Sequence, residues 1–168
     1  MSLFHRLSSF LMRRAITRTP DFIIGGEENP YLRRWHIIPR NPVFNIYLHQ
    51  ILRSDDDRAL HDHPWCNVSI ILRGEYIERV PVDQWQASGF DYVPGYTTDI
   101  TRREGDVTAR WGRWRHRLII NSTWGCWTLF ITGPVYRRWG FWCRTGWVHW
   151  QKFVDGRDKG LVGQGCGE

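Results

Sequence analysis

The chain has 168 residues, and its 23 basic side chains exceed its 17 acidic ones by six, which gives a formal net charge of +6. This length predicts a single domain whose hydrophobic core is large enough for it to fold without disulfides or a structural metal ion. Hydrophobic residues make up 42% of the chain, and no stretch approaches the roughly 18 apolar residues of a membrane-spanning helix. The composition therefore predicts a globular protein and excludes a disordered or integral membrane protein.

Cysteines and basic residues narrow the class further. The four cysteines are scattered without a CxxC pair, which argues against a thiolate zinc site and a dense disulfide scaffold. A reducing cytoplasm is the expected location. Arginine, which suits phosphate contacts, supplies nearly all of the basic side chains, but no run of five or more basic residues occurs. Nucleic-acid binding is therefore not expected.

Residues 1–30 are expected to form an N-terminal helix and a linker. Apolar residues such as Leu3, Leu7 and Leu11 recur at helical spacing, with arginines elsewhere on the helix. Pro20 and the glycines after it end this pattern. The amphipathic helix either packs against the domain or, being rich in Arg and Ser and free of acid, resembles a mitochondrial presequence.

Residues 31–153 are expected to form one all-β domain. Short β-rich segments alternate there with turns, and no helical period of any length is present. Several short strands in one small domain predict a sandwich or a barrel. Residues 81–104 are less regular and are expected to form an insertion or long hairpin over a barrel mouth. The remaining residues, 154–168, read as a glycine-rich tail.

The most informative motif is the pair His61 and His63. In a strand, side chains at i and i+2 project to the same side about 7 Å apart, so two imidazoles can close on one ion. On a helix the same pair would diverge by about 200°. Asn67 continues the inward face, whereas Asp62 points the other way and is expected to support the site rather than to ligate.

A metal ion held by two histidines needs further ligands, and His116 is the best candidate. It opens the segment HRLIIN, in which Leu118 and Ile120 continue its face toward a core. An isolated histidine is more often a hydrogen-bonded core or surface residue. The upstream pair nevertheless favours a metal site that combines all three histidines.

These residues resemble the cupin superfamily, whose motifs are G-x5-H-x-H-x3,4-E-x6-G and G-x5-P-x-G-x2-H-x3-N. His61, His63 and Gly74 match the first motif, while Gly105 and His116 match the second. The departures are Asn67 in the place of the glutamate ligand, and Trp111 and Arg113 in the second motif, where Asn121 also lies one position late.

The resemblance covers residues 44–132 and includes small bacterial and phage cupins without an assigned substrate. It implies one double-stranded β-helix, or jelly-roll, barrel with a short N-terminal helix. Many cupins pair edge strands, so a homodimer is one expectation.

The resemblance implies one divalent metal ion and leaves its chemistry open. Three imidazoles and at most one amide oxygen from Asn67 leave coordination positions free, which favours Fe(II) over Zn(II), Ni(II) or Mn(II). The ligand set is similar to that of the thiol dioxygenase branch, so oxygenase chemistry on a small molecule is implied. The alternatives are a metal-free sugar epimerase or isomerase that uses Tyr47 with His61 or His116, and a non-catalytic ligand-binding or virion-associated module.

Two further groups are candidates for ligand contact. Tyr47, His49 and Arg53 share one face of residues 44–53; they either line the cavity and bind an anionic small molecule or face solvent. An Arg-Trp cluster within residues 137–150 is either a cation–π platform or a wall that closes the barrel edge.

Overall fold

The computed structural model describes residues 2–55, 59–82, 96–155 and 163–167. Within them an N-terminal helix, α1 (Leu3–Ile16), precedes a succession of strands, and a short helix, α2 (Trp150–Phe153), follows the last strand. The strands are β1 (Phe22–Ile24), β2 (Leu32–His36), β3 (Asn45–Ile51), β4 (Leu60–His61), β5 (Asn67–Arg73), β6 (Glu75–Pro81), β7 (Thr97–Arg103), β8 (Val107–Arg110), β9 (Arg117–Ile119), β10 (Cys126–Thr132), β11 (Gly140–Cys143) and β12 (Gly146–His149).

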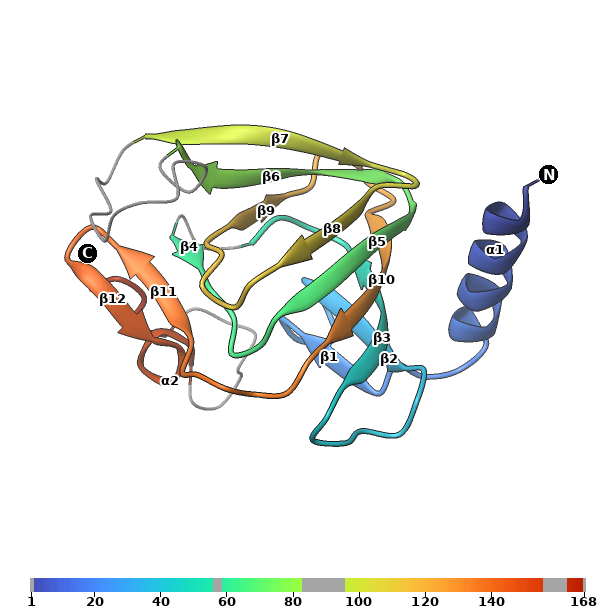
Figure 1. Ribbon diagram of the computed structural model, residues 1–168, viewed down its shortest axis with the longest axis horizontal. Coiled ribbons are helices and arrows are strands. Elements are labelled where there is room, and N and C mark those ends of the chain that lie inside the picture. Colours follow the sequence, from blue (N-terminus) through green and yellow to red (C-terminus); the bar gives the residue numbers. More distant parts are fainter. Residues whose placement is uncertain (1, 56–58, 83–95, 156–162, 168) are drawn as a thin grey trace.

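The strands form three antiparallel sheets around one interior (Figure 1). A six-stranded sheet has the order β1-β2-β3-β10-β5-β8, and two three-stranded sheets have the orders β7-β6-β9 and β12-β11-β4. The expected all-β class, with a double-stranded β-helix barrel and one N-terminal helix, is confirmed.

The hairpin between β5 and β6 turns the chain from the large sheet into the β7-β6-β9 sheet. Gly74 lies at this turn with a φ of +82°, a conformation that disfavours any side chain. A Cβ atom there would also lie 2.8 Å from the carbonyl oxygen of Gly125. The glycine that matches the first motif is therefore required by the turn itself.

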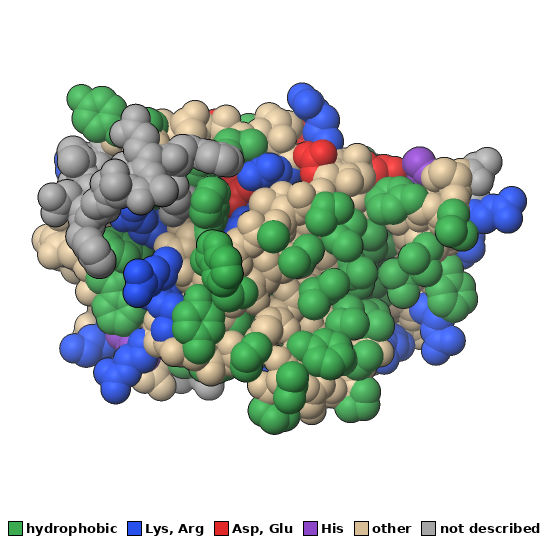
Figure 2. Space-filling view, in the orientation of Figure 1, with side chains coloured by type: hydrophobic (Ala, Val, Ile, Leu, Met, Phe, Trp, Pro, Cys, Tyr) green, Lys and Arg blue, Asp and Glu red, His purple; other side chains and the backbone are tan. Residues whose placement is uncertain are grey.

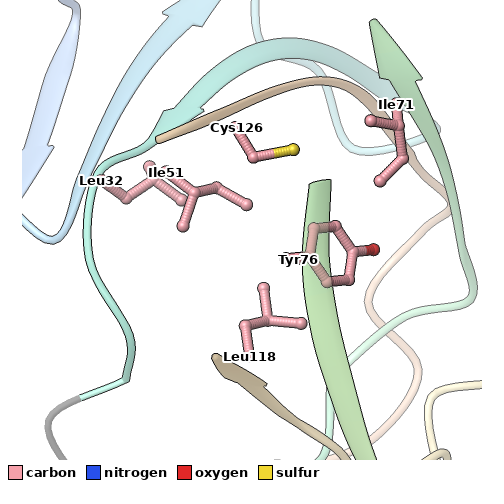
Figure 3. Close-up of a cluster of buried hydrophobic side chains, with 6 residues drawn as sticks. All are labelled: Leu32, Ile51, Ile71, Tyr76, Leu118 and Cys126. Atoms are coloured by element: carbon pink, nitrogen blue, oxygen red, sulfur yellow. The ribbon is translucent and has the colours of Figure 1, made fainter. Parts of the chain in front are cut away.

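One end of the interior is filled by an apolar cluster, the floor cluster (Figure 3). Its side chains come from the large sheet and from β6 and β9, so they meet across the interior. Inward positions farther along the same strands carry polar side chains, such as His49 on β3 and Thr128 on β10. The strands thus place a polar layer directly above the floor. The floor cluster comprises Leu32, Ile51, Ile71, Tyr76, Leu118 and Cys126.

Helix α1 covers the outer face of the large sheet. It begins where the side chain of Ser2 accepts a hydrogen bond from the backbone N–H of His5, an ordinary N-cap. Ala15 packs in a buried cluster with Trp35 and Leu48. Leu11 also packs against this cluster, whereas Leu3 and Leu7 of the expected apolar face are exposed. Figure 2 shows exposed hydrophobic side chains gathered on the side of the molecule where α1 lies.

Several segments differ from the sequence-based expectation. Residues 97–103, which belong to the segment expected as an insertion or long hairpin, form a regular strand, β7, that pairs antiparallel with β6 over seven residues, while residues 83–95 of that segment lie outside the described residues. Strand β1 lies within the expected linker. Residues 150–153, expected to be extended, form α2 because His149 caps them: its side chain accepts from the backbone N–H of Gln151.

The C-terminal segment is tied to the barrel. Cys143 of β11 forms a disulfide with Cys166, a pairing that the spacing did not predict. The backbone N–H groups of Gly163 and Gly165 also donate to the carbonyl oxygen of Phe153. No helix among the described residues is long and apolar enough to cross a bilayer.

Candidate metal centre

The three histidines of the two motifs meet at one point of the barrel wall. His61 is the last residue of β4, and His116 directly precedes β9. The two residues exchange backbone hydrogen bonds in both directions, at 2.8 and 3.0 Å. The backbone N–H of His63 donates to the carbonyl oxygen of Gly112, at 2.9 Å. Backbone bonds therefore position all three residues independently of their side chains.

The three imidazoles form a compact triangle. Ring centroids are 4.8 Å apart for His61 and His116, and 5.1 Å apart for each of the other two pairs. One ring nitrogen from each residue lies within 4.8 Å of those of the other two. The Nε2 atoms of His63 and His116 are 2.9 Å apart. Such convergence of imidazole nitrogens is the arrangement that first-row divalent metals require.

Glu78 fixes the orientation of His116. The Nδ1 atom of His116 lies 2.8 Å from Oε1 of Glu78, whose side chain is fully buried on β6. The same carboxylate accepts hydrogen bonds from Arg110, at 2.6 Å, and Arg102, at 2.8 Å. An ionised carboxylate only accepts hydrogen bonds, so Nδ1 of His116 carries the proton and Nε2 is left as an electron-pair donor.

The charge states in this network favour metal binding. Burial lowers the pKa of His63 well below its ordinary value, and the neighbouring histidines His116 and His61 lower it further. Burial also lowers the pKa of His116, to about 4, although its hydrogen bond to Glu78 acts in the opposite direction. Burial alone would raise the pKa of Glu78, but hydrogen bonds from His116 and Arg110 outweigh it and lower that pKa overall. His63 and His116 are thus neutral at pH 7, as ligands must be.

Two acidic residues, Asp55 and Asp62, lie close to the histidines in space or in sequence and hold neighbouring segments in place. Asp55 Oδ2 lies 3.6 Å from Nδ1 of His61 and accepts a hydrogen bond from the backbone N–H of Leu118. Asp62, fully buried, accepts from the backbone N–H of Gly140 and pairs with Arg137 at 3.1 Å. As the alternation predicted, Asp62 points away from the histidines and ties β4 to the C-terminal segment.

Asn67 is buried at the start of β5, opposite Thr132 and Arg110 in register. Neither its Oδ1 nor its Nδ2 has a hydrogen-bond partner among the described residues. An unsatisfied buried amide costs about 1–3 kcal/mol, so it calls for a partner such as an ion or a water. Asn67 is not among the described residues that line the cavity beside the histidines.

A cavity of about 370 Å³ opens beside the histidines. Its lower wall is part of the floor cluster, including Leu32 and Ile51, and its upper wall is largely aromatic. The ring of His63 stacks on that of Trp65 with the centroids 4.8 Å apart, and the ring of Trp139 stacks on that of Trp150 with the centroids 5.6 Å apart. All three histidines line this cavity, so a bound ion would face a space suited to a small organic molecule.

The structure separates the other candidate residues. His49 lines the cavity and is stacked between Tyr47 and Phe130. Tyr47 is buried but is not among the described lining residues. Arg53 lies outside the cavity wall as well, and its Nε donates to the carbonyl oxygen of Asn29.

Of the two readings of the Arg-Trp cluster, the structure favours the wall. Trp139 and Trp150 line the cavity, and β11 and β12 extend the sheet that carries His61. Arg137 bonds the carbonyl oxygens of His63 and Gly112 instead of facing a ligand. The segment is therefore a wall of the barrel whose inner surface is aromatic.

Sequence reasoning missed two residues of the site, Glu78 and Arg34. Both are charged side chains at inward positions of strands, Glu78 between Tyr76 and Val80 on β6, and Arg34 beside Trp35 on β2. For Glu78, a charge within the otherwise apolar inward face of β6 was the available signal. It was masked because the opposite face of that strand is also mixed in polarity.

No family model matches the chain, and no curated protein matches it either. Solved structures with similar folds include Fe(II)-HppE with an alternative substrate, at 14% identity and a TM-score of 0.46 over 69% of this chain and 58% of that one. An uncharacterized Klebsiella pneumoniae protein with a double-stranded beta-helix domain has 11% identity and a TM-score of 0.47 over 71% and 90%. A variant of Bacillus subtilis oxalate decarboxylase has 13% identity and a TM-score of 0.43 over 62% and 25%.

Proposed function

We propose that this protein binds one divalent metal ion through His61, His63 and His116 and acts on a small molecule in the adjoining cavity. The observation that carries the proposal is the convergence of three imidazole nitrogens within 4.8 Å at the wall of that cavity. A cluster of imidazoles that served only packing would not need a carboxylate to set the tautomer of one of them, as Glu78 does for His116.

The residues present fit such an ion. Three neutral imidazoles suit Fe(II), Zn(II), Ni(II) and Mn(II), and Asn67 is the candidate for a fourth ligand because its buried amide lacks a partner among the described residues. When bound, the ion supplies Lewis acidity and, if it is redox-active, electron transfer with O2. Glu78 holds the proton on Nδ1 of His116, and the aromatic wall limits the access of water to the bound small molecule.

The finer proposal is a mononuclear non-haem Fe(II) oxygenase. It is supported by the small number of protein ligands, which leaves coordination positions open toward the cavity. A structural site would be closed by protein on all sides. Neutral ligands also leave the charge of the ion uncompensated by protein, which favours an anionic substrate.

Metal analysis of protein purified without a histidine tag tests the proposed metal site. We expect about one equivalent of a divalent metal in the wild type and less than a tenth of that in His63→Ala, because each imidazole is a large part of a sparse ligand set. The matched control is His5→Ala, since His5 lies on α1 and pairs with the exposed Glu104. Equal metal content in all three proteins would refute the assignment.

Oxygen uptake tests the proposed oxygenase activity. The Fe(II)-loaded protein is mixed with small thiols and small carboxylates, and O2 consumption is compared with that of free iron. We expect consumption above background that disappears in His116→Ala. Full metal loading without consumption for any compound would reject the oxygenase while leaving the metal site intact.

One observation favours a second candidate, a metal-free isomerase or epimerase. Tyr76 and His116 line the same cavity, and both are linked to Glu78, His116 directly and Tyr76 through the hydrogen bond that its hydroxyl accepts from Arg110. A base and an acid on one cavity wall are what proton transfer at carbon requires. Tyr76 replaces Tyr47 in this reading. Activity that persists after chelation and dialysis would select it.

A further inference from the structure

The wall of the cavity contains a cation, Arg34, that has no acidic partner among the described residues. Arg34 and Arg110 are its two basic lining residues that remain charged at any ordinary pH. Arg110 is paired with Glu78 at 2.6 Å. The acidic lining residue Asp55 is engaged by the backbone of Leu118 and lies beside His61.

The guanidinium of Arg34 is held in a fixed orientation. Its Nε donates to Nε2 of His49 at 2.9 Å, and its central carbon lies 4.7 Å from the centroid of the Tyr47 ring. Arg34 and His49 are directly opposite each other in the pairing of β2 with β3. Because Nε is used on His49, the two terminal nitrogens form the part of the guanidinium left for a ligand.

This arrangement has an energetic consequence. Burial lowers the pKa of Arg34, and the contributions in the opposite direction come from the phenols of Tyr47 and Tyr31 and not from a carboxylate. A desolvated cation without a counter-charge is unfavourable unless a ligand supplies the charge. The terminal nitrogens of an arginine form a planar fork that matches the two oxygens of a carboxylate.

The surface between Arg34 and the histidines is aromatic. His49 stacks on Phe130 with ring centroids 5.1 Å apart, and Phe130 lies 6.4 Å from His63 and 5.6 Å from Trp65. A molecule that reached from Arg34 to the histidines would therefore lie over rings, and its body would be apolar or aromatic.

We propose that the cavity takes a small monocarboxylate with an apolar or aromatic body, and that Arg34 binds its carboxylate. A single guanidinium matches one carboxylate, whereas a phosphate dianion would need a second cation, and the other lining arginine, Arg110, is committed to Glu78. The inference rests on the proposed function only in treating the cavity as the ligand site. Binding at Arg34 does not require the metal.

The experiment compares two isosteric probes, benzoate and neutral benzamide, in metal-free protein by isothermal titration calorimetry. We expect benzoate to bind at least about tenfold more tightly, as one charge-assisted pair provides. Arg34→Gln should abolish this preference. The matched control, Arg33→Gln, should retain it, because Arg33 is the neighbouring residue on the outer side of β2, opposite Gln50.

The outcomes separate this inference from the metal site. Circular dichroism establishes that both variants are folded, and Arg34→Lys provides a second variant that keeps the charge without the fork. Equal affinities for benzoate and benzamide in the wild type, or an unchanged preference in Arg34→Gln, would overturn the assignment of Arg34. Tighter binding of phenylphosphonate than of benzoate would overturn the carboxylate. Metal content, measured on the same variants as purified and before the metal is removed, reports on the proposed function alone.

Discussion

Glu78 and His116 are joined by a hydrogen bond of 2.8 Å between Oε1 and Nδ1, with both side chains buried. The carboxylate also neutralises Arg110, whose side chain is 1% exposed. One residue thus sets the tautomer of a candidate ligand and balances a buried cation. The chemistry of the site and the stability of the barrel therefore depend on the same group.

Glu78→Gln keeps the shape of the side chain and removes its charge. We expect the free energy of unfolding to fall by about 3–5 kcal/mol, because Arg110 is left buried without its counter-charge. Urea denaturation followed by tryptophan fluorescence measures the change. Glu75→Gln is the matched control, since Glu75 is exposed on the same strand, and it should alter stability by less than about 0.5 kcal/mol. Similar values for both variants would contradict the assigned role of Glu78.

Asn67→Leu tests the unsatisfied amide. If the amide contacts the ion, its removal lowers metal affinity, and we expect a loss of about tenfold with the fold retained, which competition with a fluorescent chelator can measure. The control is Ser69→Ala, two residues along the same face of β5. If Asn67→Leu binds metal as tightly as the wild type and melts at a higher temperature, the Asn67 amide does not contact the ion and only destabilises the fold as an unpaired buried polar group.

Acid should destabilise the metal-free protein in a way that depends on His49. Burial lowers the pKa of His49 well below its ordinary value, and Arg34 and His36 lower it further. Below about pH 6.5, His49 is protonated in the unfolded chain but stays neutral in the folded chain. The free energy of unfolding therefore decreases as the pH falls. The slope approaches about 1.4 kcal/mol per pH unit for each such histidine.

In His49→Gln, which retains an acceptor for Arg34, the fall between pH 7 and pH 5 should be smaller than in the wild type. Urea midpoints at several pH values measure the difference. His63 and His116 act in the same direction and remain in the variant. Identical pH profiles for wild type and His49→Gln would contradict the prediction.

The disulfide between Cys143 and Cys166 should stabilise the C-terminal wall. The two cysteines are 23 residues apart in sequence, and closing a loop of this size contributes about 2–4 kcal/mol. We expect Cys166→Ser to melt at a lower temperature than the wild type and to show no further loss on reduction. Cys66→Ser, which removes a free cysteine, is the control. A melting temperature that reduction leaves unchanged would argue that the bond does not constrain the fold.

The sequence predicted the strands whose side chains alternate clearly between apolar and polar. For residues 81–104 it predicted only an insertion or long hairpin, without the strand that forms inside that segment. The i, i+2 spacing predicts that His61 and His63 share one side of a strand; the two do lie together, but β4 ends at His61, and the backbone bond to Gly112 positions His63. Strand β7 has the exposed, polar segment TTDITRR and owes its conformation to hydrogen bonds with β6. No local pattern reports such pairing.

The face of β3 could not be chosen from the sequence, because both of its faces are buried. Leu48, fully buried, lies in the cluster under α1, while His49 faces the cavity. A strand covered on both sides carries no inside-outside contrast for alternation to reveal. For the same reason the importance of Arg34 became visible only once its neighbours His49 and Tyr47 were in place.

The reciprocal backbone bonds between His61 and His116 have a kinetic consequence. Two imidazoles separated by 55 positions in the chain are already held at the spacing an ion needs, so loading requires little reorganisation of the polypeptide. Exchange of one metal for another would then proceed at the pace of ligand substitution on the ion, without a folding step of the chain.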